Sequence, residues 1–160
     1  MNVNEQATRI SVIGGSKASQ DMRDVAEQAG RRIAERGAIL VCGGMGGVME
    51  AACRGAKQAG GTTVGIVPTR RADDANPHVD IPIVTGMGDA RNVSVALSGM
   101  GIIAIDGRFG TLSEMALGLN ANRPLAAINA PAEDEFSQLD NVHLARSADD
   151  AVSWMFEQIT

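Results

Sequence analysis

The sequence predicts a three-layer α/β fold, in which a mostly parallel sheet carries helices on both faces. Short runs of β-branched residues alternate with amphipathic helical patterns along the chain, as in successive βαβ units. Glycine is unusually frequent, with 19 glycines in 160 residues, and it clusters where predicted strands end. Since right-handed crossovers bring the carboxyl ends of parallel strands to one edge of the sheet, we expect these glycine clusters to converge there.

The N-terminal half is predicted to form three strands and two helices. Ser19 is placed to cap the first helix, whose apolar face repeats at helical spacing until Gly37 ends it. The second helix, over about 48–59, has a face of small residues that would permit close approach to the sheet. The strands are apolar or β-branched runs over 9–13, 38–42 and 62–67.

The C-terminal half begins with a polar segment, 68–80, whose turn residues predict a long loop. An extended piece over 81–84 leads to a helix from about Asp89, and a later helix ends before Pro124. Ser147 is placed to cap the last helix. The remaining strands are predicted over 101–105, 125–129 and 142–144. Without a repeat or a second domain pattern, residues 1–160 are expected to form a single domain.

Composition argues against several classes of protein. A net charge of −5 and a pI near 5.0 disfavour a basic nucleic-acid surface, and 2% aromatic residues provide few rings for stacking on bases. The N-terminal MNVNEQATRI lacks a signal region, and no stretch has a membrane-spanning length. Two cysteines, Cys42 and Cys53, fit a reducing cytoplasm. His78 and His143 lack metal-ligand spacing, so no metal site is predicted.

Four glycine-rich segments follow predicted strands or extended pieces: 14–16, 43–47, 85–88 and 106–111. A glycine turn that opens a helix exposes backbone N–H groups at the positive end of the helix dipole, which suits a phosphate. Neither a G-x-G-x-x-G after the first strand nor a P-loop is present, and the spacing of Lys17 does not fit the latter. The predicted ligand-binding residues are Gly14, Gly15, Ser16, Gly43, Gly44, Gly46, Gly47, Gly107, Arg108, Phe109, Gly110 and Thr111.

Glu114 allows two interpretations. Thr111 and Glu114 are three residues apart before an apolar stripe, which is the pattern of a capping box. Alternatively, Thr111 contacts a phosphate and Glu114 faces a ribose, where a carboxylate would stabilise an oxocarbenium-like transition state or activate water. Arg91 is expected in the first turn of a helix, where the dipole disfavours a cation, so it contacts either a ligand or a carboxylate of Asp89 or Glu114.

The segments ISVIGGS, GAILVCGGMGGVMEAACRGAKQAGGTTVGIVP, ANPHVDIPIVTGMGDARNVSVALSG and GTLSEMALGLN resemble the molybdenum cofactor carrier proteins and their bacterial and archaeal relatives. These proteins are similar to the LOG-type cytokinin riboside 5′-monophosphate phosphoribohydrolases, often mislabelled lysine decarboxylases. The resemblance covers about residues 9–129. It implies a Rossmann-like fold, a phosphate site at the G-x-G-T turn, and a homodimer or larger homo-oligomer.

The LOG-type motif P-G-G-x-G-T-x-x-E is only partly kept. Gly107, Gly110, Thr111 and Glu114 match it, and Arg91 matches an upstream arginine; Asp106, Arg108 and Asn92 replace a proline, a glycine and a lysine. If the protein is an enzyme, the resemblance implies that Glu114 and Arg91 are catalytic.

The expected function is therefore binding of a phosphorylated nucleotide- or pterin-like ligand in the manner of a molybdenum cofactor carrier. The alternative is hydrolysis of the N-glycosidic bond of nucleoside 5′-monophosphates. No cofactor is expected to be required, although a nucleoside monophosphate or the molybdenum cofactor is a possible bound ligand.

Overall fold

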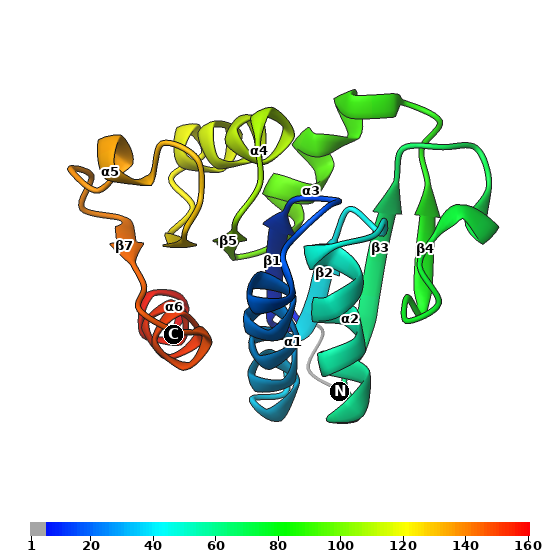
Figure 1. Ribbon diagram of the computed structural model, residues 1–160, viewed down its shortest axis with the longest axis horizontal. Helices are drawn as coiled ribbons and strands as arrows, with labels where there is room; N and C mark the ends of the chain where they lie inside the picture. Colours follow the sequence, from blue (N-terminus) through cyan, green and yellow to red (C-terminus); the bar gives the residue numbers. More distant parts are fainter. Residues whose placement is uncertain (1–5) are drawn as a thin grey trace.

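The computed structural model describes residues 6–160 and contains a seven-stranded sheet (Figure 1). The strands are β1 (Arg9–Gly14), β2 (Ile39–Cys42), β3 (Thr63–Val67), β4 (Ile81–Val84), β5 (Gly101–Ile105), β6 (Leu125–Ile128) and β7 (Val142–Leu144). Their order in the sheet is β4-β3-β2-β1-β5-β6-β7, and all six pairings are parallel. The predicted Rossmann-like α/β fold is confirmed, and each predicted strand lies within two residues of its expected bounds.

Helices cover both faces of the sheet, as predicted. They are α1 (Gln20–Glu35), α2 (Val48–Gln58), α3 (Asn92–Ser98), α4 (Phe109–Asn120), α5 (Glu133–Phe136) and α6 (Ala148–Ile159), with 3-10 turns η1 (Ala72–Asp74) and η2 (Gly88–Arg91). Figure 1 shows α1, α2 and α6 on one face, and α3 and α4 on the other. Ser19 and Ser147 cap α1 and α6, because their hydroxyls accept from the backbone N–H groups of Met22 and Asp150.

Two elements differ from the sequence prediction. The segment from Asp89 begins as the 3-10 turn η2 and becomes the helix α3 only at Asn92. The short helix α5 was not predicted, because its four residues, EDEF, are too few and too acidic to show an apolar helical period.

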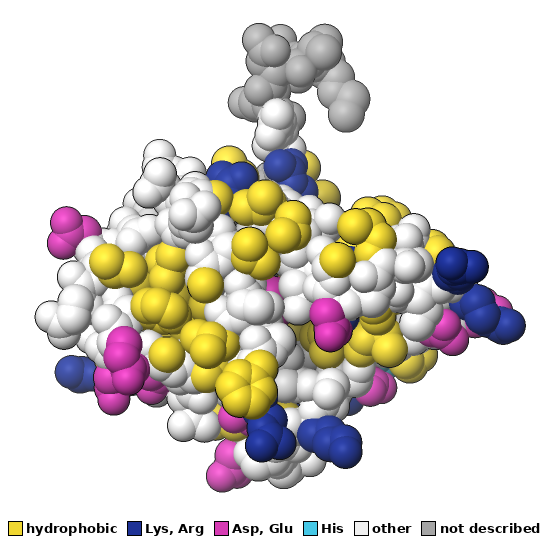
Figure 2. Space-filling model, turned by 90° about the horizontal axis from the view of Figure 1, so that it is seen from above, with side chains coloured by type: hydrophobic (Ala, Val, Ile, Leu, Met, Phe, Trp, Pro, Cys, Tyr) yellow, Lys and Arg dark blue, Asp and Glu magenta, His cyan; other side chains and the backbone are white. Residues whose placement is uncertain are grey.

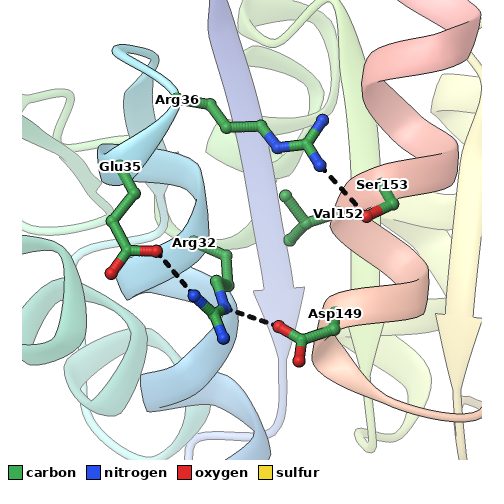
Figure 3. A pocket seen from close by; sticks show the side chains of 6 residues that line it. All are labelled: Arg32, Glu35, Arg36, Asp149, Val152 and Ser153. Carbon is green, nitrogen blue, oxygen red and sulfur yellow. Dashed lines mark hydrogen bonds and ion pairs between the residues drawn. The ribbon is translucent and has the colours of Figure 1, made fainter.

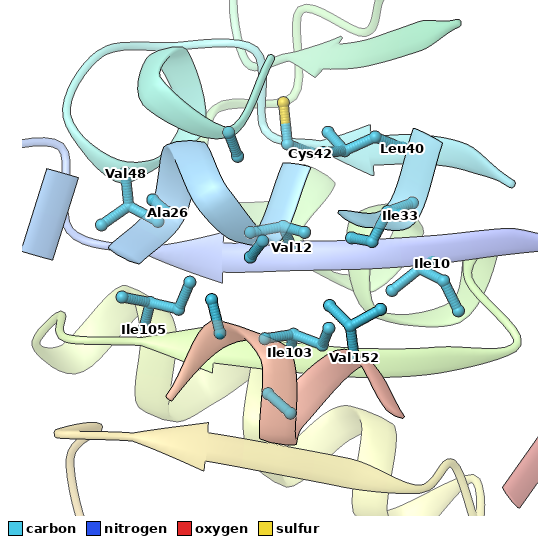
Figure 4. Packing of buried hydrophobic residues seen from close by; sticks show 14 of the residues in the cluster. Ile10, Val12, Ala26, Ile33, Leu40, Cys42, Val48, Ile103, Ile105 and Val152 are labelled. Atoms are coloured by element: carbon cyan, nitrogen blue, oxygen red, sulfur yellow. The ribbon is translucent and has the colours of Figure 1, made fainter. Parts of the chain in front are cut away.

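The hydrophobic core lies on both sides of the central strands. Ile10 and Val12 of β1 pack with the helices of the α1, α2 and α6 layer (Figure 4). Ile13 belongs to a second cluster on the opposite face, which includes Val95 of α3 and Met115 of α4. Because both faces are covered, the central strands are nearly continuous apolar runs rather than alternating ones.

The order of the strands places a topological switch point between β1 and β5. From β1 the chain proceeds outward through β2, β3 and β4, and from β5 it proceeds in the other direction. In open α/β sheets, ligands bind in the crevice outside the carboxyl ends of the strands at such a point. The fold therefore predicts a ligand site at the turns that follow β1 and β5.

Among residues 6–160, no helix combines the length and apolar character needed to cross a lipid bilayer. Residues 1–5, which belong to the segment that shows no signal region in the sequence, lie outside the described chain.

The small-residue face of α2 contacts α1 as well as the sheet. A Cβ atom on Gly55 would lie 1.8 Å from the carbonyl oxygen of Glu27, and one on Gly30 would lie 1.9 Å from that of Ala52. In both cases the added Cβ would meet a backbone atom of the other helix, which cannot move aside as the end of a flexible side chain can. The sequence had indicated close approach to the sheet, and the structure adds the α1–α2 crossing.

We expect Gly30→Ala to lower the free energy of unfolding by about 1–3 kcal/mol through overpacking, although alanine has the better helix propensity by about 1 kcal/mol. Urea unfolding measures the loss. Gly118→Ala is the matched control, because there the added Cβ meets mainly the terminal Cδ1 atom of Ile102. A loss in the control as large as that in Gly30→Ala would contradict the proposed backbone contact.

Candidate functional site

A hollow of about 380 Å³ opens beside the turns that follow β1 and β5. Its exposed rim is formed by Ser16, Lys17, Asp89, Arg108 and Gly110. The other lining residues are mostly buried and come from the β1 turn, α2, η2, α3 and α4: Gly14, Gly15, Met49, Arg91, Asn92, Thr111 and Glu114. The hollow therefore has two rim cations, one rim carboxylate and a buried carboxyl group.

The structure brings half of the predicted ligand-binding residues to this pocket. Gly14, Gly15, Ser16, Arg108, Gly110 and Thr111 line it, together with Arg91 and Glu114. Phe109 is the first residue of α4 and is 84% exposed, and Gly107 lies beneath the turn against Thr111.

The glycine loop 43–47 lies behind the pocket wall rather than on it. The backbone N–H of Val48, directly after the loop, donates to the Gly15 carbonyl at 3.0 Å. Asn76, from the long loop 68–80, donates through its side chain to the Met45 carbonyl and through its backbone to that of Gly44. The loop thus supports the first glycine turn, and Asn76 holds the loop.

The turn after β5 has an unusual backbone. Asp106 has a φ of 54° and Gly107 a φ of 107°, both in the left-handed region. A Cβ at Gly107 would also lie 2.1 Å from the Thr111 hydroxyl oxygen. Arg108 has a φ of −138°, so its position does not need glycine. Because proline fixes φ near −65°, the proline of the LOG-type motif is incompatible with this backbone at Asp106.

The first turn of α4 has no side-chain cap. The helix begins at Phe109, so Thr111 lies inside the first turn rather than at the N-cap position, and the capping-box interpretation of Thr111 and Glu114 is wrong. Arg108 occupies the N-cap position and makes no capping hydrogen bond. Gly110 and Thr111 of this first turn line the pocket, so backbone N–H groups without intrahelical acceptors lie at the pocket wall.

Glu114 is the buried acid of the pocket. It is 7% exposed, and no group within residues 6–160 forms a hydrogen bond with its carboxyl group, whose oxygens open onto the pocket. Burial raises the pKa of Glu114 to about 8, against the opposing effect of the positive charge of Arg91. The side chain is therefore mostly protonated at neutral pH, when it both donates and accepts hydrogen bonds.

The Arg91 guanidinium binds backbone carbonyls rather than a carboxylate. Its Nε donates to the Ile66 carbonyl at 3.0 Å and its Nη2 to the Gly43 carbonyl at 3.4 Å, while Nη1 contacts the Asn92 side chain. In the described chain it forms no ion pair with Asp89 or Glu114, the two partners that the sequence had suggested. Arg91 thus joins the ends of β2 and β3 to η2.

Four lining residues were not among the predicted site residues. Asp89 and Asn92 flank Arg91 in the same turn, so their sequence proximity to it was an available signal. Lys17 follows the first glycine turn directly. Met49 lies in the first turn of α2 and also lines the pocket.

A second hollow, of about 280 Å³, lies between α1 and α6 (Figure 3). Its charges are mutually satisfied: Arg32 pairs with Glu35 and Asp149, and Arg36 donates to the Ser153 hydroxyl. These contacts join two helices, and the hollow contains no buried unpaired group like Glu114. The pocket at the sheet edge is therefore the better candidate for a ligand site.

Comparison with known proteins gives the same fold and a family. A model of the SLOG cluster4 family matches residues 7–153. The chain belongs to this family. An uncharacterized protein of Archaeoglobus fulgidus is 42% identical over 123 residues, which are 77% of this chain and 81% of the relative.

Two solved structures place this SLOG cluster4 protein beside the molybdenum cofactor carriers. The molybdenum cofactor binding protein of Rippkaea orientalis superposes with a TM-score of 0.91 at 36% identity, covering 97% of this chain and 99% of that one. The molybdenum cofactor carrier protein of Chlamydomonas reinhardtii gives 0.86 at 37% identity, with coverage of 96% and 98%. The resemblance found in the sequence is confirmed.

The raised pKa of Glu114 predicts a pH-dependent effect of Glu114→Gln. As pH rises from about 4.5 to about 8, the unfolded chain loses this proton and the folded chain keeps it, so the acid destabilises the native protein progressively. The free energy of unfolding of the wild-type protein therefore falls by up to about 1.4 kcal/mol per pH unit in this range. Glutamine does not titrate, so the variant does not show this fall. Urea unfolding at pH 5 and pH 8 should show a larger advantage of the variant at pH 8; an equal difference at both values would contradict the prediction.

Proposed function

We propose that this protein binds a phosphorylated nucleotide- or pterin-like ligand, as a carrier related to the molybdenum cofactor carriers. The observation that carries the proposal is the combination of an uncapped start of α4 and the unpartnered, buried Glu114 in one pocket. A free helix start attracts an anion, and an unpartnered buried carboxyl group favours a ligand that supplies its hydrogen bonds.

The phosphate is proposed to lie at the start of α4. The N–H groups of the first turn and the Thr111 hydroxyl would donate to it, and Lys17 and Arg108 at the rim supply positive charge. The α1 and α6 starts are less suited, because the hydroxyls of Ser19 and Ser147 already occupy them.

The ring system is proposed to lie deeper, between Met49 and Glu114. Met49 is 8% exposed and lines the pocket, where its side chain offers a polarizable apolar surface to a flat ring. A protonated Glu114 would donate to a ring nitrogen or carbonyl and accept from an adjacent N–H. Purines and pterins both carry such neighbouring donors and acceptors, which is why the pocket suits either class.

The carrier is favoured over the hydrolase by the turn after β5. The left-handed backbone at Asp106 cannot contain the motif's proline, and Arg108 stands where the motif has glycine. Arg91 also directs two of its nitrogens at backbone carbonyls, which leaves it less available to a substrate.

Isothermal titration with AMP, GMP and the molybdenum cofactor tests the proposal. We expect at least one of them to bind, and its unphosphorylated counterpart to bind more weakly. Arg108→Ala should weaken binding roughly tenfold, as expected for loss of a charged hydrogen bond. Arg36→Ala, in the hollow between α1 and α6, is the matched control and should bind normally. Failure of all three ligands to bind would refute the proposal.

The same samples separate carrying from hydrolysis. Release of free base and ribose 5-phosphate from AMP, abolished in Glu114→Gln with binding retained, would establish the phosphoribohydrolase alternative instead. Unchanged nucleotide after prolonged incubation is the result that we expect of a carrier.

We also propose that the protein works in the cytoplasm as a homo-oligomer. Support for the homo-oligomer comes from an exposed apolar side of α3 and the preceding turn, where Met87 is 56%, Val93 43% and Leu97 40% exposed. Figure 2 shows several groups of hydrophobic side chains on the face of the molecule seen from above. Exposed apolar surface of this kind is typical of a contact between subunits.

Val93→Asp combined with Leu97→Asp should reduce the molar mass in solution to that of one chain, because two charges would have to be desolvated in the interface. Light scattering after size exclusion measures the mass. Leu144→Asp, an exposed apolar position on β7, is the control. An oligomer that survives the double substitution would exclude α3 as the contact.

A further inference from the structure

The chain's two cysteines lie side by side in the interior. Cys42 is the last residue of β2 and Cys53 lies in α2, and both are fully buried. Their Sγ atoms are 3.5 Å apart, close enough for one thiol to donate to the other. A disulfide bond is about 2.05 Å long, so a shift of roughly 1.5 Å between the sulfurs would bring them to bonding distance.

The surroundings make the two thiols unequal. The thiol of Cys53 and the backbone N–H of Gly44 both contact Cys42 Sγ, the latter at 3.3 Å. The contact between the two thiols is the main cause that lowers the pKa of Cys42, and the Arg91 charge acts in the same direction. The same contact, together with burial, raises the pKa of Cys53. With the backbone N–H of Gly44 at its sulfur, which stabilises a thiolate, Cys42 is assigned as the nucleophile and Cys53 as the resolving thiol.

We propose that Cys42 and Cys53 form an oxidation site, at which a small uncharged peroxide converts the two thiols into an intramolecular disulfide. The Cys42 thiolate attacks one peroxide oxygen, the O–O bond breaks, and the departing hydroxide takes a proton to become water. The sulfur of Cys53 then attacks Cys42 Sγ and expels the second oxygen as water, with the Cys53 proton. The protein loses two hydrogen atoms, and hydrogen peroxide is reduced to two waters.

The disulfide would change the pocket's supporting loop. Cys42 leads directly into Gly43, whose carbonyl accepts from Arg91, and its sulfur accepts from the Gly44 N–H. Cys53 lies one helical turn after Met49, which lines the pocket. Drawing the sulfurs together therefore pulls the end of β2 toward α2 and displaces the Gly44 N–H from its acceptor. The oxidation site is thus coupled to loop 43–47.

Intact-mass spectrometry of the folded protein after hydrogen peroxide treatment tests the chemistry. We expect a loss of two hydrogen atoms, and no alkylation by N-ethylmaleimide after denaturation, whereas the untreated chain takes up two alkyl groups. Dithiothreitol should restore both. Cys42→Ala and Cys53→Ala are the controls, and each should prevent the loss. Persistence of two alkylatable thiols, addition of oxygen atoms instead, or a disulfide between two chains would overturn the proposal.

Hydrogen exchange of the backbone tests the coupling without any ligand. In the wild-type protein, oxidation should change the exchange rates of residues 43–49 about fivefold or more, in the range of typical coupling between sites. Peroxide should leave these rates unchanged in the double variant Cys42→Ala/Cys53→Ala. A disulfide that forms without altering this segment would disprove the coupling, whatever the protein carries.

Discussion

The architecture of the site depends on one buried guanidinium group. The guanidinium of Arg91 is bound by backbone carbonyls instead of a carboxylate. The carbonyls of Ile66 and Gly43 accept hydrogen bonds from it at the ends of β3 and β2. Strand ends otherwise leave such carbonyls without partners. The same charge opposes the upward shift of the Glu114 pKa and favours the thiolate of Cys42. One side chain thus joins two strand ends at the sheet edge and contributes to the electrostatics of two chemically distinct groups.

The N-termini of the helices differ in whether a side chain caps them. Serine hydroxyls satisfy α1 and α6, whereas α2 and α4 begin without side-chain caps. For α2, the preceding loop supports the first glycine turn through the Val48 hydrogen bond to Gly15. For α4, the first turn opens into the pocket. A cap contributes about 1 kcal/mol to stability, so its absence at α4 is a stability cost that an anion would offset.

Local signals in the sequence predicted most of the fold and part of the pocket. Ser19 and Ser147 were recognisable as caps because capping depends on neighbours in the chain. Thr111 was open to the wrong interpretation, since α4 begins three residues earlier than a capping box with Thr111 at the N-cap requires. The carbonyl partners of Arg91 and the contact between Cys42 and Cys53 join segments separated in the chain. Their discovery required the tertiary structure.

On the proposed carrier function, the crossing of α1 and α2 has a mechanical consequence for the release of a ligand. Backbone contacts at Gly30 and Gly55 lock these helices into one block, and both glycine turns at their starts are attached to it. The opposite wall, α4, belongs to the other layer and packs with α3. A movement that widens the pocket would therefore displace the α4 wall relative to this block, rather than open the glycine turns themselves.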